Sequence, residues 1–564
     1  MRFIGLLAAL FLAGCALLPG EAAAPPSGGP RVMVATANPL ATAAGLKVLR
    51  QGGSAIDAAV AVQAVLGLVE PQSSGLGGGA FMVYYDAATR KVTAYDGRET
   101  APAGAAPDMF LDDAGKPVPF IAAMVSGRAT GAPGAVAMLA LAHKAHGRRP
   151  WASLFGDAEQ LAEGGFVVSP RLAGFIASPF PQAGGVDARR YFARPDGTRL
   201  RAGDRLNNPA YAETLRQLAA RGPAALQEGP IAEAIVARVR QGDLPGTLSL
   251  ADLRAYRPQS GDALCRPYRI YVVCTTQPAS SGVGLLQGLL LLERTDIAER
   301  GPADPVAWLR LAEAERVMYA DRDRFVGDPA FVDVPVEGLL SPDYIARRAA
   351  LIGDRVGPEP QPGDPAGAGV RGRDQTPEPG GTSHFVIVDA DGNVVSITTT
   401  VESVFGSGRM VAGFFLNNQL TDFSFSPTDE DGAPAANAAA AGKRPRSSMS
   451  PVIVLDRQGR LVAALGSPGG SSILSYNLKA LVGLLDWRLS LQEAFDLPNL
   501  VARGDVFSSE PARYPAGVVD GLAARGLVFG NTAGENSGLH GVVMTPDGLV
   551  GAADSRREGV AEGF

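Results

Sequence analysis

Two apolar stretches near the start of the chain predict helices. Residues 39–51 are rich in alanine and leucine, and residues 54–69 are apolar on almost every side. The glycine pair between them would end the first helix, and Ser54 with Asp57 has the spacing of a capping box at the start of the second. A helix that is apolar all round is typically buried, so we expect residues 54–69 inside the protein.

Alternating and β-branched runs predict strands elsewhere. Residues 81–86 alternate after a glycine-rich loop, and residues 382–388 form a second apolar run. Residues 389–393, Asp-Ala-Asp-Gly-Asn, are typical of a hairpin turn, so residues 394–401 should return beside 382–388. Further helical patterns cover residues 135–146 and 305–322.

The glycine-rich segment Gly75–Gly79 resembles a nucleotide-binding loop in composition only. A dinucleotide fingerprint follows a strand and opens a helix, whereas this segment follows a helix and leads into a strand. We interpret it as a core loop in which the backbone approaches another segment closely.

Residues 353–381 contrast with their surroundings. They contain many glycines and prolines and no apolar period, so we expect a long mobile stretch on the surface. This stretch runs directly into Gly381 and Thr382, at the start of a core strand. A breaker-rich stretch that leads directly into a core strand is the pattern expected at a cleavage site in the chain.

Composition excludes several classes of protein. The 564 residues are 46% hydrophobic and 19% charged, which provides for a large core, in several domains or in one large layered domain. The net charge of −6, with no basic block, gives no electrostatic support for a nucleic-acid partner. Three cysteines and four histidines, without metal-ligand spacing, predict no metal site.

The N-terminus has the pattern of an export signal. Arg2 precedes the apolar run 3–12, which is too short to span a bilayer, and the run ends in Leu-Ala-Gly before Cys15. This resembles a bacterial lipoprotein signal, in which the cysteine becomes the lipid-bearing N-terminus. The alternative is an ordinary signal peptide with a chance cysteine. Residues 16–30 would form a flexible tether.

The expected location follows from the same signal. A lipid on Cys15 would be the only attachment to a membrane, and Ala16 directly after it points to the outer membrane rather than to inner-membrane retention. The catalytic body would then face the periplasm or the exterior.

Export also bears on the other two cysteines. Cys265 and Cys274 flank two short extended stretches joined by a turn. In an oxidising compartment a local disulfide between them is plausible, and the alternative is a pair of buried thiols.

Thr382 is a candidate nucleophile. A threonine hydroxyl is a weak nucleophile, and one way to activate it is to make the threonine the first residue of a chain, so that its own α-amino group acts as the base. With a pKa near 8, a useful fraction of that amine is unprotonated at neutral pH. This chemistry requires cleavage between Gly381 and Thr382.

The motifs around this junction identify a family. The chain resembles the γ-glutamyltransferase (glutathione hydrolase) family of N-terminal-nucleophile hydrolases over nearly its whole mature length. The matching motifs, in family order, are residues 96–102 (DGRETAP), 381–385 (GTSHF), 398–400 (TTT), 416–423 (LNNQLTDF), 443–451 (KRPRSSMSP), 466–470 (GSPGG) and 551–559 (GAADSRREG).

The resemblance implies roles for individual residues. Thr382 would be the nucleophile of self-cleavage and then of catalysis, and Thr400 would lie beside it and hydrogen-bond it. Gly469 and Gly470 would offer backbone N–H groups to the oxyanion. A γ-glutamyl group carries an α-carboxylate and an α-ammonium. The family pattern assigns the carboxylate to Arg98, Ser447 and Ser448, and the ammonium to Glu402, Gln419 and Asp422.

Some details differ within the family. The positions of Glu402 and Gln419 vary among members, which leaves the details of ammonium binding open. Residues 424–442 would form a lid over the pocket, and its one aromatic residue here is Phe425. The balance between hydrolysis and transfer therefore stays open.

Taken together, we expect an α/β protein with a four-layer αββα sandwich of the N-terminal-nucleophile type, autocleaved into two interlocked subunits. Residues 1–14 would be the signal peptide, 15–30 the tether, 31–381 the large subunit and 382–564 the small catalytic subunit. The substrate would be a small γ-glutamyl compound, the acceptor water or an amino acid or peptide, and no cofactor would be needed.

Two rival functions remain. A cephalosporin or glutaryl acylase on the same fold would have no α-ammonium to bind, and retention of Glu402, Gln419 and Asp422 argues against it. A non-catalytic binding lipoprotein would not need Thr382 and Thr400 together with the glycine pair at 469–470.

Overall fold

The computed structural model describes residues 28–374, 376–530 and 536–564 of a continuous chain in which Gly381 is joined to Thr382. The signal peptide, Cys15 and most of the proposed tether lie outside the described residues. No helix in the described part of the chain is long and apolar enough to cross a membrane.

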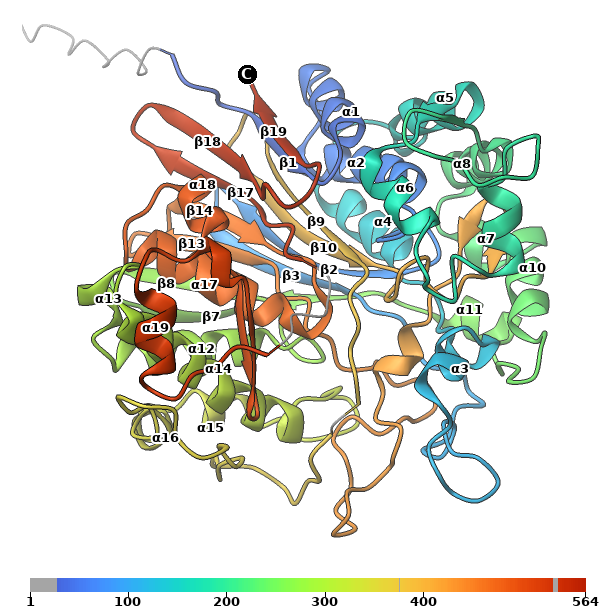
Figure 1. The fold of residues 1–564 in the computed structure, drawn as a ribbon. Helices are drawn as coiled ribbons and strands as arrows, with labels where there is room; N and C mark the ends of the chain where they lie inside the picture. The colour runs from blue at the N-terminus through green and yellow to red at the C-terminus, as the bar shows by residue number, and fades with distance from the viewer. Residues whose placement is uncertain (1–27, 375, 531–535) are drawn as a thin grey trace, which may run out of the picture.

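Two antiparallel sheets form the centre of the molecule (Figure 1). The first has seven strands in the order β19 (Val560–Gly563), β1 (Met33–Thr36), β9 (Thr382–Val388), β10 (Val394–Thr400), β2 (Gly79–Asp86), β3 (Lys91–Gly97) and β6 (Gln259–Asp262). The second has six, in the order β18 (Gly548–Ala553), β17 (His540–Thr545), β14 (Leu461–Gly466), β13 (Val452–Asp456), β8 (Tyr271–Thr275) and β7 (Leu264–Tyr268).

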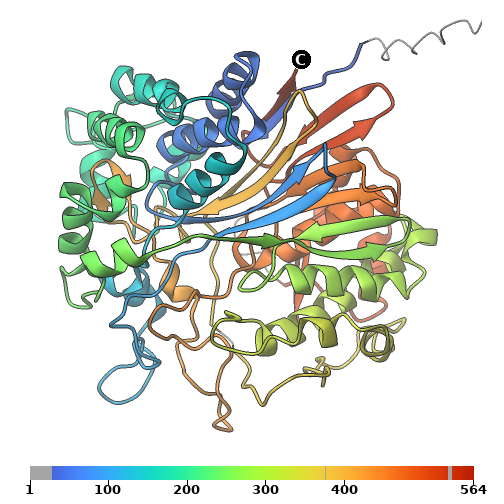
Figure 2. The ribbon, with the colours of Figure 1, turned by 180° about the vertical axis from the view of Figure 1, so that it is seen from behind.

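Helices cover the outer face of each sheet, as the views from the two sides show (Figures 1 and 2). The first sheet is covered mainly by α1 (Pro39–Arg50), α2 (Ala55–Val69), α4 (Ala135–His146), α5 (Gly156–Gly164), α6 (Pro170–Ile176), α8 (Pro209–Arg221) and α10 (Pro230–Val239). The second is covered by α12 (Gly282–Glu293), α14 (Pro305–Phe325), α17 (Ile473–Leu485), α18 (Leu491–Asp496) and α19 (Val518–Ala523).

Shorter elements connect these layers. The remaining helices are α3 (Phe120–Met124), α7 (Val186–Tyr191), α9 (Ala224–Gln227), α11 (Leu250–Ala255), α13 (Ile297–Arg300), α15 (Val336–Leu339) and α16 (Pro342–Ala349). Three two-stranded sheets pair β4 (Phe166–Val167) with β5 (Arg205–Leu206), β11 (Met410–Val411) with β12 (Phe414–Phe415), and β15 (Leu500–Arg503) with β16 (Val506–Ser509).

The apolar core has the three layers that this architecture requires. One cluster lies between the first sheet and its helices, a second between the second sheet and its helices, and a third between the two sheets. Val386 and Val388 of β9 face Ile453 and Ala464 of the other sheet in this third layer. The expected αββα sandwich is therefore the fold of this chain.

The helices and strands expected from the sequence are present. Helix α2 is buried at every residue, and Ser54 caps it: its Oγ accepts from Asp57 N–H at 3.2 Å, while an Asp57 carboxylate oxygen accepts from Ser54 N–H at 2.8 Å. Strands β9 and β10 pair through the turn at 389–393. The glycine-rich loop approaches a neighbour closely, since a Cβ on Gly78 would lie 1.9 Å from the Thr400 carbonyl oxygen.

The chain on either side of residue 381 contributes to both sheets. In the first sheet, β9 and β10 lie between β1 and β2; in the second, β8 pairs with β13. Strands from the two proposed subunits therefore hydrogen-bond to each other within both sheets and pack in the same core layers.

The stretch 353–381 has no helix or strand in its described residues, as expected, but its end is not on the surface. Asp374 and Thr376 are buried, and the Glu378 side chain is only 5% exposed. The expectation of a surface segment is wrong here because ion pairs with buried arginines hold Asp374 and Glu378 inside.

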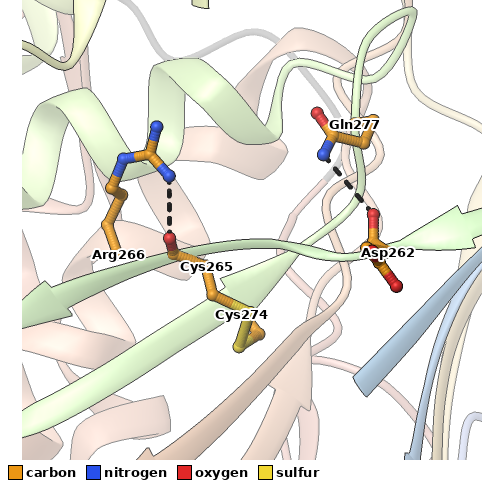
Figure 3. The surroundings of a disulfide bond; sticks show 5 residues. All are labelled: Asp262, Cys265, Arg266, Cys274 and Gln277. Carbon is orange, nitrogen blue, oxygen red and sulfur yellow. Dashed lines mark hydrogen bonds between the residues drawn. A yellow bond between two sulfur atoms is a disulfide. The ribbon is translucent and has the colours of Figure 1, made fainter. Parts of the chain in front are cut away.

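Cys265 and Cys274 form a disulfide across the β7–β8 hairpin, with the sulfurs 2.06 Å apart (Figure 3). Arg266 donates a hydrogen bond to the Cys265 carbonyl oxygen at 2.9 Å, and the disulfide ties the edge strand β7 of the second sheet to its neighbour β8. Gln277 donates to the Asp262 carbonyl oxygen at 3.4 Å close by (Figure 3).

Candidate active site

Thr382 is the first residue of β9 and lies directly opposite Thr400, the last residue of β10. The Thr382 hydroxyl donates to Thr400 Oγ1 at 3.2 Å. Thr400 in turn donates to the carbonyl oxygen of Gly381 at 2.9 Å, and Glu402 N–H donates to Thr400 Oγ1 at 2.8 Å. Two hydroxyls and the carbonyl of the 381–382 peptide thus form one hydrogen-bonded chain.

A pocket opens beside these two threonines. Its lining includes nine of the ten residues to which the sequence assigns catalysis or substrate binding, brought together from separate parts of the chain between residues 98 and 470. The lining residues are Arg98, Glu378, Pro379, Thr382, Thr400, Glu402, Gln419, Asp422, Ser447, Ser448, Met449, Gly470 and Ile473.

Arg98 follows β3 and is fully buried on one side of the pocket. Its Nε donates to the Pro445 carbonyl oxygen at 3.0 Å, and its Nη2 donates to the Arg446 carbonyl oxygen at 2.7 Å and to an Asp422 carboxylate oxygen. The guanidinium is therefore held in one orientation. Its remaining Nη1 donates no hydrogen bond within the described residues and lies 3.8 Å from Glu99 Oε2.

The buried side chains of Glu402, Gln419 and Asp422 form the acidic side of the pocket. Ser403 and Asn418 donate to one Glu402 carboxylate oxygen, and Gln419 Nε2 donates to Asp422 at 3.2 Å. Burial raises the pKa of Glu402 well above its usual value, and the nearby Asp422 carboxylate raises it further. Burial also raises the pKa of Asp422, although Arg98 opposes this.

Two acceptor atoms on the acidic side of the pocket make no hydrogen bond in the described part of the chain. Neither Glu402 Oε1 nor Gln419 Oε1 accepts a hydrogen bond within the described part of the chain, although both are buried. Buried polar atoms in folded proteins nearly always have partners, so unpaired ones in a pocket indicate a place for a ligand. Residues of the pocket wall thus carry one guanidinium donor and two side-chain acceptors that make no hydrogen bond within the described residues.

The serine pair belongs to a segment that is fixed by backbone hydrogen bonds. Ser447 N–H donates to the Ala279 carbonyl oxygen at 2.9 Å, and the Ser447 carbonyl accepts from Ser281 N–H at 2.7 Å. Ser448 Oγ donates to Glu378 at 2.9 Å and accepts from Arg322 at 2.7 Å. Both hydroxyls lie in the pocket wall.

The turn at Gly469 and Gly470 precedes α17 and needs glycine at both positions, with φ values of +136° and +57°. A Cβ on Gly470 would lie 2.6 Å from the carbonyl oxygens of Glu378 and Pro379. Gly470 lines the pocket, and Gly469 stands directly behind it against Tyr476. In the continuous chain, the end of the 353–381 stretch therefore covers this turn.

The space left in the pocket is about 20 Å³, which holds a water molecule but no amino acid. Glu378 and Pro379 take up the rest. The expected lid segment 424–442 contributes no lining residue; Phe425 instead stacks on Phe110 at 4.4 Å between ring centroids. In the uncut chain, the residues before Thr382 cover the pocket, not those after Phe423.

Sequence reasoning missed several residues of this site. Glu378 and Pro379 lie in a stretch without any periodic pattern, so nothing in the sequence singled them out. Arg446 stands inside the KRPRSSMSP motif, which is a signal that could have been used, and Arg322 ends the helical pattern 305–322.

No group of three or more His, Cys, Asp or Glu side chains in the described ranges could hold a metal ion.

This architecture and this site define a class of protein. Two facing antiparallel sheets between helical layers, with a threonine at the start of a central strand and a pocket at its hydroxyl, are the fold of the N-terminal-nucleophile hydrolases. A solved structure, cephalosporin acylase from Bacillus halodurans, is similar to this chain with a TM-score of 0.83 and 25% identity, covering 97% of this chain and 99% of that one.

The family model described as gamma-glutamyltranspeptidase matches residues 41–564, and the chain belongs to that family. A glutathione hydrolase proenzyme of Bacillus subtilis (strain 168) is 37% identical, over 99% of this chain and 97% of the relative. An acylase ACY 1 proenzyme of Pseudomonas sp. (strain SE83) is 35% identical, over 95% and 94% respectively.

Proposed function

We propose that this protein is a γ-glutamyl hydrolase and transferase that cleaves the γ-glutamyl amide of glutathione and related compounds. The observation that carries the proposal is the set of unpaired polar atoms in the pocket. Arg98 Nη1 is a donor for an α-carboxylate, while Glu402 Oε1 and Gln419 Oε1 are acceptors for an α-ammonium. Family membership supports the same reading.

The reaction would begin with self-cleavage. Thr382 Oγ attacks the Gly381 carbonyl carbon, the hydroxyl proton passes to the departing amide nitrogen, and water then hydrolyses the resulting ester. The products are a large piece ending at Gly381 and a small piece whose N-terminus is Thr382. Thr400 supports the step because its hydroxyl already donates to the carbonyl oxygen that becomes negative.

The mature reaction would use the new α-amino group of Thr382 as the base. That amine accepts the hydroxyl proton as Oγ attacks the γ-carbonyl of the substrate, and returns the proton to the leaving amine. A γ-glutamyl ester on Thr382 results, which water or an acceptor amine resolves. The backbone N–H groups at Gly469 and Gly470 would stabilise the oxyanion, each contributing about 3 kcal/mol.

The acylase relatives favour a second candidate, a glutaryl or cephalosporin acylase. Such a substrate has a carboxylate but no α-ammonium. It would leave the Glu402 and Gln419 acceptors buried without donors, which costs roughly 1–3 kcal/mol for each group. The pocket therefore fits a γ-glutamyl head better than a glutaryl head.

The test combines maturation with substrate choice. Wild-type protein should run as two pieces, the smaller beginning Thr-Ser-His-Phe, and should release nitroaniline from γ-glutamyl-p-nitroanilide far faster than from glutaryl-p-nitroanilide. Added glycylglycine reports transfer. Thr382→Ala should remain one inactive chain of full mass, while Thr382→Ser keeps a hydroxyl and should still be cut. An active single chain would contradict the mechanism.

Arg98 provides an independent test of the binding mode. Arg98→Lys keeps the positive charge but loses the Nη1 donor and the hydrogen bonds that fix the guanidinium, so KM for γ-glutamyl donors should rise at least tenfold while self-cleavage continues. Unchanged KM in a matured variant would remove Arg98 from the substrate site.

We further propose that the enzyme is exported and anchored by lipid on Cys15, facing the periplasm or the exterior. The support is the sequence pattern alone: a short apolar run ending in Leu-Ala-Gly-Cys, followed by Ala16. The tether would let the catalytic body sit in water, where small peptides arrive by diffusion.

A further inference from the structure

The carboxylate of Glu378, three residues before Gly381, lies in a built anion site. Arg322 grips it at two points, Nη1 to Oε1 and Nη2 to Oε2, both at 2.7 Å. Arg446 Nη2 donates to Oε1 at 2.9 Å, and Ser448 Oγ donates to Oε2 at 2.9 Å. Both guanidiniums are buried, at 1% and 0% exposure.

The two arginines are held independently of Glu378. Arg322, on α14, donates from Nε to Ser281 Oγ at 3.0 Å and from Nη1 to Asp323 at 3.0 Å. Arg446 donates from Nη1 to the Asp323 carbonyl oxygen at 3.3 Å and from Nη2 to Asp374 at 3.0 Å. The site would therefore keep its shape if Glu378 left it.

If Glu378 leaves this buried cluster of arginines and carboxylates, another anion is needed to balance the positive charge. Three guanidiniums, of Arg322, Arg446 and Arg503, share the carboxylates of Asp323, Asp374 and Glu378. Burial by itself raises the pKa of Glu378, but Arg322 and Arg446 outweigh this and hold the pKa below its usual range, so the carboxylate is ionised. Without it a buried positive charge is left unpaired, which is strongly unfavourable.

The position of Glu378 links this anion site to the nucleophile. Glu378 and Ser448 line the same pocket as Thr382. Ser471 N–H donates to the Glu378 carbonyl oxygen at 3.3 Å, so the same residue also covers the turn at Gly469 and Gly470. A substrate can reach that turn only when this segment has withdrawn, and its withdrawal exposes Arg322 and Arg446.

The far side of the same segment borders a second hollow. Thr376 and Pro377 line a cleft of about 720 Å³, together with Phe120, Arg373 and Phe425. The segment 376–379 therefore separates the small pocket at Thr382 from a much larger cleft. Without this partition, a group attached to the scissile nitrogen of a donor, or an acceptor amine, has room beyond the γ-glutamyl head.

We propose that Arg322 and Arg446, once residues 376–381 withdraw after cleavage, form a second carboxylate subsite beside the γ-glutamyl pocket. The inference rests on the proposed function. The ligand is a free carboxylate on the part of the reaction partner beyond the scissile amide: that of the donor's leaving group, or that of the acceptor. Glu378 occupies the position of this carboxylate in the uncut chain.

A matched pair of donors tests the subsite. γ-Glutamyl-3-carboxy-4-nitroanilide differs from γ-glutamyl-p-nitroanilide by one carboxylate on the leaving group. Wild-type enzyme should favour the carboxylated donor in kcat/KM at least tenfold, and Arg446→Gln and Arg322→Gln should bring that ratio close to one. Arg310→Gln is the control, because Arg310 lies on the same helix α14 but pairs with Asp296 and Asp354 outside this charge cluster, and it should leave the ratio as in wild type.

A second arm distinguishes the source of the carboxylate. Glycylglycine and glycylglycinamide are compared as acceptors with γ-glutamyl-p-nitroanilide as donor. If wild type prefers glycylglycine and Arg446→Gln abolishes this preference, the subsite binds the carboxylate of the acceptor. If only the two donors are distinguished, the subsite binds the carboxylate of the leaving group. The wild-type ratios show whether a second carboxylate is recognised, and the matured variants show whether Arg322 and Arg446 recognise it.

The outcomes separate the two proposals. If wild type turns over both donors and both acceptors without preference, the subsite is refuted while the γ-glutamyl activity stands. If the arginine variants lower kcat/KM for both donors equally, Arg322 and Arg446 serve the γ-glutamyl head and the inference is wrong. If matured wild type turns over no γ-glutamyl donor, the proposed function itself fails.

Discussion

The hydroxyl of Thr400 donates a 2.9 Å hydrogen bond to the carbonyl oxygen of Gly381, the residue directly before Thr382. The same hydroxyl accepts from Thr382 Oγ1. One side chain thus touches both the attacking group and the attacked carbonyl of the proposed cleavage, and it does so because the last pair of the β9–β10 register places Thr400 opposite Thr382.

Thr400→Val should therefore slow self-cleavage. The substitution keeps the shape of the side chain but removes the donor to the carbonyl oxygen, and losing one such donor typically costs about 10²–10³ in rate. The fraction of intact chain over time, followed by mass spectrometry, measures the effect. Thr400→Ser retains the hydroxyl and should mature nearly as wild type does; equal rates for Val and wild type would exclude the role.

Gly78→Ala should disturb the same site from outside the pocket. Its Cβ would stand 1.9 Å from the Thr400 carbonyl oxygen, so β10 would have to move. We expect poor maturation together with a lower melting temperature. Gly156→Ala is the matched control, because a Cβ there has no atom within 4 Å. Normal maturation of Gly78→Ala would show that β10 tolerates the shift.

The raised pKa of Glu402 predicts how binding depends on pH. A substrate ammonium needs the ionised carboxylate, whereas burial and Asp422 favour the protonated form in the pocket without substrate. Binding then releases a proton, so affinity falls as pH drops below that raised pKa, by up to about tenfold per pH unit. The inhibition constant of L-glutamate against pH measures this.

Glu402→Gln provides the comparison for that profile. The glutamine keeps a carbonyl acceptor but does not titrate, so the part of the pH dependence that belongs to Glu402 should disappear from the inhibition constant. Any dependence shared by wild type and variant belongs to another group, such as the Thr382 amine. Superimposable profiles would contradict the assignment.

The proposed lipid anchor predicts where the activity is found. Activity of the wild type should sediment with membranes and partition into detergent, since two or more acyl chains give lasting attachment. Cys15→Ser should move the activity to the soluble fraction without changing its specific rate, because residue 15 is remote in sequence from the site. A soluble wild-type enzyme that begins beyond residue 15 would refute the anchor.

Much of the fold could be read from the sequence because its signals are local. The capping box at Ser54, the hairpin at 389–393 and the all-apolar helix α2 each depend on residues within a few positions of one another. The family motifs also predicted nine residues of the pocket wall, among them Arg98, the serine pair and Asp422.

The sequence by itself determined the family, the layered architecture and the choice of Thr382 as the candidate nucleophile. Only the tertiary structure decided that residues 376–381 fill the pocket and that Glu378 is held by Arg322 and Arg446. Those residues are 56 and 68 positions away from Glu378 along the chain. Their ion pairs exist because α14 and the segment after the lid converge on one buried point, and no local pattern records such a convergence.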